Sequence, residues 1–104
     1  MPETRFSFES RKEVAIALNA YMAHPALGEQ RLIEACARIC TESHTMHLSS
    51  EQMVLALKRL YAELPGESKL PEEEKRRHAA FDALLAGCIK AYVEAETARR
   101  MKPS

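Results

Sequence analysis

The chain has 104 residues, of which 46% are hydrophobic and 29% charged, and its fifteen basic residues balance fifteen acidic ones. A chain of this length and composition can bury one hydrophobic core, which excludes disorder as its main state. The charge balance holds in both halves of the chain, so neither half carries the strong field that attracts polyanions from a distance. We expect a single soluble domain over residues 1–104.

The compartment is inferred from what the sequence lacks. The polar, mixed start of the chain does not have the basic, apolar and small-residue regions of a signal peptide. No apolar run approaches the roughly 20 residues that span a bilayer. Three cysteines are an odd number, which suits reduced thiols better than a set of disulfides. The sequence therefore predicts a cytoplasmic protein without membrane association.

A first helix is predicted over residues 9–22, with Ser7 or Ser10 as its N-cap. Apolar residues at helical spacing mark its buried face. They are Val14, Ala17, Leu18, Tyr21 and Met22. Phe6 and Phe8 are expected to pack back onto this helix and anchor the N-terminal segment.

A second helix is predicted over residues 25–43. His24 precedes a proline and is disfavoured in a helical conformation, whereas Pro25 suits the first turn of a new helix. The predicted core stripe is Leu32, Cys36, Ile39 and Cys40, with Ile33 beside it. Residues 43–48 then form a short turn.

The third predicted helix, over residues 49–64, has the clearest boundaries. Ser49 and Gln52 have the spacing of a capping box, and Pro65 and Gly66 end the segment. Its apolar stripe is Met53, Leu57, Leu60, Tyr61 and Leu64.

The fourth predicted helix is the longest and covers residues 71–101. Pro71 suits its first position, and the three glutamates at 72–74 and the basic residues at 99–102 complement the helix dipole at opposite ends. Its stripe is Phe81, Leu84, Leu85, Cys88, Ile89 and Tyr92. At 1.5 Å per residue it would be about 45 Å long, against about 25 Å for the third helix. These elements predict an all-α, single-domain bundle of about four helices with a long C-terminal helix.

The difference in helix length suggests a contact with another chain. If the last turns of the fourth helix overhang the bundle, their apolar residues need a partner surface, and a second copy of the chain is the simplest one. The predicted interface residues are Tyr92, Val93, Ala95 and Met101. A frayed, solvated tail is the alternative, because this end of the helix is strongly polar.

A second hypothesis is a metal site. Cys36, Cys40 and His44 follow one another at intervals of four, so a continuous helix would bring two thiolates and an imidazole near one another, and Cys88 could complete a tetrahedron. The spacing differs from that of common zinc modules, however, and the cysteines fall on core stripes. We therefore favour core packing for the three cysteines, interpret His44 as part of an exposed linker beside the turn, and expect no cofactor.

A third hypothesis is a helix-turn-helix nucleic-acid-binding regulator, with Lys58 and Arg59 on the third helix. The zero net charge and Glu51 at the start of that helix argue against it.

Catalysis has no support in the sequence. The three glycines are isolated, no GxSxG or HExxH pattern occurs, and His78 lacks the setting expected of a phosphotransfer histidine. The leading hypothesis is a small cytoplasmic protein-interaction or regulatory module that is not an enzyme. It would act by helix-mediated binding to another protein or by self-association as a homodimer.

Overall fold

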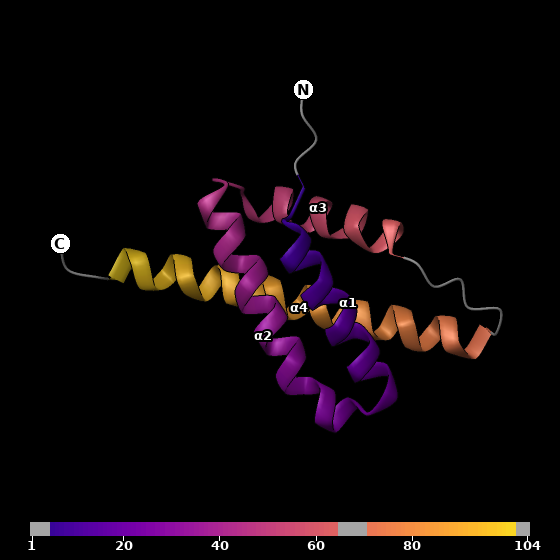
Figure 1. Ribbon diagram of the computed structural model, residues 1–104. Coiled ribbons are helices and arrows are strands. Elements are labelled where there is room, and N and C mark those ends of the chain that lie inside the picture. The colour runs from indigo at the N-terminus through magenta and orange to yellow at the C-terminus, as the bar shows by residue number, and fades with distance from the viewer. Residues whose placement is uncertain (1–4, 65–70, 102–104) are drawn as a thin grey trace.

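The computed structural model describes residues 5–64 and 71–101. These residues form four α-helices, namely α1 (Phe8–Ala23), α2 (Pro25–Thr45), α3 (Ser50–Glu63) and α4 (Pro71–Met101) (Figure 1). The predicted all-α architecture with a long C-terminal helix is confirmed, and every helix end lies within two residues of its expected position. No helix in the described ranges is both long and apolar enough to cross a membrane.

α1 and α2 form a helical hairpin in which only His24 lies between the two helices. Pro25 takes the first position of α2, where its missing N–H costs no helical hydrogen bond. The two helices approach closely, because a Cβ atom added to Gly28 would lie 2.5 Å from backbone atoms of Tyr21. Glycine at position 28 is therefore needed for packing.

A polar network joins the start of α1 to the end of α2. The Ser7 hydroxyl caps α1 by accepting a hydrogen bond from the backbone N–H of Ser10. The Glu42 carboxylate accepts hydrogen bonds from the Ser7 backbone and from the hydroxyls of both serines. Arg38 Nε lies 3.3 Å from the Ser10 hydroxyl and donates to it. Ser10 is fully buried, and these bonds satisfy its hydroxyl.

A short turn leads from α2 into α3. His47 adopts a φ of 58°, in the left-handed region, and the Leu48 N–H donates to the Ser43 carbonyl at 2.8 Å. Ser49 and Gln52 form both reciprocal hydrogen bonds of the predicted capping box. The start of α3 is thus set by the residues that the sequence indicated.

α4 crosses behind α1 and α2, and both of its ends project beyond them (Figure 1). The molecule extends 52 × 36 × 20 Å, and its smallest dimension corresponds to two layers of helices about 10 Å wide. α4 is therefore covered mainly on one side. The centre of the core consists of Val14, Ile39, Met53, Leu57, Leu84 and Cys88.

Three apolar residues that were expected to pack inward are exposed. Phe8 is 68% exposed, so only Phe6 anchors the N-terminal segment, and Ile33 and Ile89 are 54% and 41% exposed. An apolar stripe in a sequence covers more of a helix's circumference than a single neighbouring layer can bury. Residues at the edges of the stripe therefore remain at the surface.

Candidate functional site

The three cysteines are buried, as their places on the core stripes predicted. The thiol of Cys36 donates to the Leu84 carbonyl at 3.4 Å. Interaction with the neighbouring Cys88 thiol lowers the pKa of Cys36, and the same interaction together with burial raises the pKa of Cys88. Burial raises the pKa of Cys40 above its ordinary value of 9.0. The pKa values of Cys40 and Cys88 are thus raised, whereas that of Cys36 is lowered.

His44, the histidine of the predicted metal site, is held by α4. Its ring stacks on Tyr92 with the centroids 4.6 Å apart and the planes 13° from parallel, and its Nδ1 lies 3.7 Å from the Glu96 carboxylate. Its Nε2 is buried without a hydrogen-bond partner among the residues described. The interpretation of His44 as part of an exposed linker is therefore wrong.

The cysteines and histidines do not form a metal-binding group. In the described part of the chain, no three or more His, Cys, Asp or Glu side chains are placed to hold a metal ion. The physical reason lies in the helix, which advances about 12 Å along its axis over the eight residues from Cys36 to His44. This distance is too long for one ion to bridge.

The predicted interface residues divide into different environments. Tyr92 is used within its own chain, because it is half-buried and its hydroxyl donates to the Leu48 carbonyl at 2.8 Å. Ala95 is also half-buried, whereas Val93 is exposed. The side chain of Met101 lies outside the described part of the structure. Val93 is therefore the predicted residue that remains fully available to a partner.

An apolar surface extends over adjoining parts of α3 and α4. Leu55 is 61% and Val93 is 53% exposed, and Ile89 lies one helical turn before Val93 on the same side of α4. A hollow of about 450 Å³ here is lined by Ser50, Glu51, Val54, Leu55 and Ile89. We refer to Val54, Leu55, Ile89 and Val93 as the α3–α4 surface.

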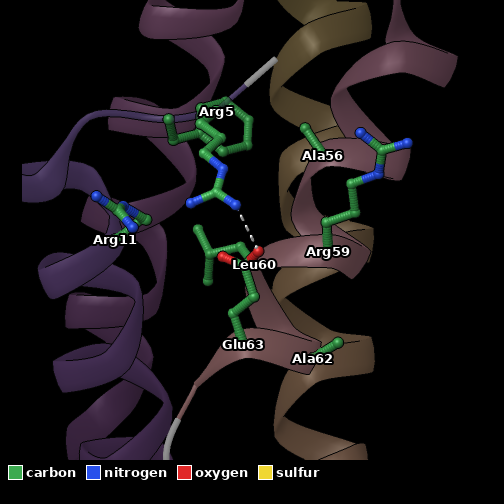
Figure 2. A pocket seen from close by; sticks show the side chains of 8 residues that line it. Arg5, Arg11, Ala56, Arg59, Leu60, Ala62 and Glu63 are labelled. Atoms are coloured by element: carbon green, nitrogen blue, oxygen red, sulfur yellow. Dashed lines mark hydrogen bonds and ion pairs between the residues drawn. The ribbon is translucent and has the colours of Figure 1, made fainter. Parts of the chain in front are cut away.

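A second recessed region lies between the start of α1, with the residues that lead into it, and α3 (Figure 2). Its first hollow, of about 270 Å³, is lined by Arg5, Phe6, Arg11, Ala56, Arg59, Leu60, Ala62 and Glu63. An adjoining hollow of about 280 Å³ is lined by Phe8, Arg11, Lys12, Ala15, Leu60, Glu63 and Leu64. We refer to both together as the α1–α3 groove.

The polar groups of the α1–α3 groove come from both sides. Arg5 reaches across to α3, where its Nη2 donates to the Glu63 carboxylate at 3.2 Å (Figure 2). Arg11 extends from α1, and its Nε is buried without a hydrogen-bond partner within the described ranges. Because 48 residues separate Arg11 from Arg59, no local sequence pattern could have revealed this groove.

The basic run early in α4 is partly engaged inside the protein. The Arg77 guanidinium lies 4.8 Å from the centre of the Tyr61 ring, and its Nη2 donates to the Leu64 carbonyl at 3.2 Å. His78 is exposed, as expected, with its Nδ1 3.3 Å from the Tyr61 hydroxyl. Arg77 is thus drawn onto α3, which does not favour its use in contacting nucleic acid.

Searches against protein families, curated proteins and solved structures find no match to this chain. Its function is therefore argued from its own surfaces.

Proposed function

We propose that this protein is a small cytoplasmic interaction module that acts by binding rather than by catalysis. We further propose that it self-associates as a homodimer through the α3–α4 surface. The observation that carries this proposal is the exposure of Leu55, Ile89 and Val93 on two neighbouring helices beside an apolar hollow. Contiguous exposed apolar patches of this kind are typical of protein-interaction sites. The free thiols of the described residues are compatible with a reducing compartment.

The exposed side of α4 extends this surface along the helix. Ala86 precedes Ile89 and Val93 on that side, at intervals of three and four residues. These intervals are those of a helix that packs along a second helix, and an alanine allows the two backbones to approach closely. A two-fold dimer uses the same patch on both copies, which makes a long, one-sided helix a suitable element.

The charges beside the apolar residues are arranged to complement a second copy. Lys90 and Glu94 are both exposed and lie one helical turn apart. If two copies of α4 pair in antiparallel orientation about a two-fold axis near residue 92, Lys90 of each copy faces Glu94 of the other. Such complementary charges fix orientation and disfavour wrong partners. They support a second copy as the occupant of this surface.

The experiment that tests this proposal is sedimentation velocity of wild-type protein and the Val93→Asp variant over a concentration series. The wild type should sediment as a dimer, and Val93→Asp should sediment as a monomer because a carboxylate would be buried without a partner. Leu27→Asp is the matched control, since Leu27 is 75% exposed near the start of α2 and lines neither the α3–α4 hollow nor the recess beside Lys90.

Circular dichroism should show that both variants remain helical. A wild type that is monomeric at every concentration would contradict self-association. Dissociation of Leu27→Asp to the same extent as Val93→Asp would contradict the choice of surface.

A further inference from the structure

We propose that the α1–α3 groove is a binding site for an acidic amphipathic helix of a partner protein, one that carries an apolar side chain beside its carboxylates. This site is separate from the α3–α4 surface and does not depend on self-association.

The first argument is charge. Among the described residues, four basic residues and one acidic residue line the two hollows of the groove. The basic residues are Arg5, Arg11, Lys12 and Arg59, and the acidic residue is Glu63. In a protein with zero net charge, this is a local excess of positive charge. Guanidinium groups bind carboxylates through paired N–H donors, so an acidic ligand matches the lining.

The second argument is the hydrogen bonding and ion pairing of these arginines. Arg11 Nε is a buried donor without an acceptor among the residues described, and leaving such a group unpaired costs free energy that a ligand oxygen would recover. Arg59 is exposed and has no hydrogen bond or ion pair within those residues. Arg5 pairs with Glu63 across the groove, and both side chains are about half exposed, so the attraction between these two groups is weak.

The third argument is the apolar part of the groove. Phe6, Ala56 and Leu60 are buried and form the apolar part of its lining. Phe8 lines the second hollow and is the largest strongly exposed side chain on α1. A ligand with an apolar side chain next to its acidic groups would cover this ring and reach the arginines together.

The shape and charge pattern favour a peptide over other anions. Each hollow is smaller than the roughly 300–1,000 Å³ of a typical small-molecule pocket, but the two adjoin along α1 and α3. An elongated recess between two helices suits an amphipathic helix laid along it. A nucleic-acid backbone offers no apolar side chain to cover Phe8 and the apolar lining, whereas an amphipathic helix does.

The test is a fluorescence-anisotropy titration with a labelled helical peptide that presents Glu and Leu along one side. Wild-type protein should bind this probe saturably, and a matched peptide with Lys in place of Glu should not bind. The Arg11→Gln/Arg59→Gln double variant should bind about tenfold more weakly or worse, since hydrogen bonds to charged groups are lost. Phe8→Ala should also weaken binding.

Arg31→Gln is the matched control, because Arg31 is exposed on α2 outside the groove. Circular dichroism verifies that each variant is folded. The proposal is wrong if the Glu peptide does not bind, if the double variant binds it as wild type does, or if Arg31→Gln has an equal effect. Displacement of the probe by free glutamate, inorganic phosphate or a single-stranded oligonucleotide at similar concentration would assign the groove to another ligand class.

Two measurements separate this proposal from self-association. Val93→Asp should still bind the peptide, and Arg11→Gln/Arg59→Gln should sediment as wild type does. If the double variant instead loses self-association, a second copy of the chain occupies the groove and the peptide proposal is wrong.

Discussion

Apolar residues occur on two opposite sides of α4, but one side is buried and the other is exposed to solvent. The inner side places Ala80, Phe81, Leu84 and Cys88 in the core, whereas the outer side exposes Ala86, Ile89 and Val93. Because apolar residues occur on both sides, the composition of the helix does not distinguish them. What distinguishes them is that α1, α2 and α3 pack against the inner side and leave the outer side exposed.

The largest expected contrast is between Leu84→Ala and Ile89→Ala. Leu84 is fully buried, so its truncation should lower the free energy of unfolding by about 3 kcal/mol through lost burial and the cavity left behind. Ile89 is partly exposed, and its truncation should cost less than about 1 kcal/mol in the monomer. Urea unfolding followed by circular dichroism, at a concentration where the protein is monomeric, measures both. Equal losses would show that the outer side is covered too.

A second contrast concerns Gly87, where α4 lies against α2. A Cβ atom at this position would lie 2.7 Å from Cys36 Sγ, so Gly87→Ala should destabilise the protein by about 2 kcal/mol through overpacking. In a Cys36→Ala background the obstruction is removed, and the same substitution should become neutral or stabilising, since alanine favours a helix by about 1 kcal/mol over glycine. A four-variant cycle in urea measures this coupling. An unchanged effect of Gly87→Ala in both backgrounds would contradict the close contact.

Tyr92 follows the core residues of α4 along the helix. Its substitution should have a smaller effect on stability, and it tests whether the buried side of α4 extends this far. Tyr92→Phe removes the hydrogen bond to the Leu48 carbonyl and should lower the free energy of unfolding by about 1 kcal/mol. Tyr21→Phe is the control, because Tyr21 is also half-buried, and its change should stay within about 0.5 kcal/mol. Thermal unfolding compares the two. If Tyr92→Phe leaves the stability unchanged, the hydrogen bond from Tyr92 to Leu48 does not help to hold α4 in place.

The smallest expected effect is a dependence of stability on alkaline pH. Burial raises the pKa of Cys40 above 9.0, so the unfolded chain releases this proton at a lower pH than the native protein does. The contribution of the neutral thiol is complete below about pH 9 and is lost as the pH rises through the raised pKa. Urea midpoints between pH 8 and pH 10 should fall less steeply for Cys40→Ala than for the wild type. A steeper fall for Cys40→Ala than for the wild type would contradict the upward shift in the pKa of Cys40.

Several features of the fold were predictable because they depend on neighbouring residues. The capping box of Ser49 and Gln52 acts within one turn, and Pro25 and Pro71 restrict their own backbone dihedrals. These local effects act in the same way in any tertiary setting. The helix boundaries could therefore be predicted closely.

The candidate sites were predictable only in part. Val93 was predicted at an interface and is exposed. Tyr92 was predicted both on the apolar stripe and at the interface, and its hydroxyl is held by a carbonyl 44 positions away in the chain. The α1–α3 groove was missed, because Arg11 and Arg59 become neighbours only after α3 returns alongside α1. Spacing along one helix contains no information about which helix will lie opposite.

The sequence by itself thus determined four helices, their boundaries and the residue types on each side of them, because caps, prolines and periodicity act over a few residues. Only the tertiary structure decided which apolar residues of α4 are buried, where Tyr92 and His44 meet, and that three arginines line one recess. The physical reason is that burial and electrostatic proximity depend on distances between segments, and these distances exist only once the two layers have packed.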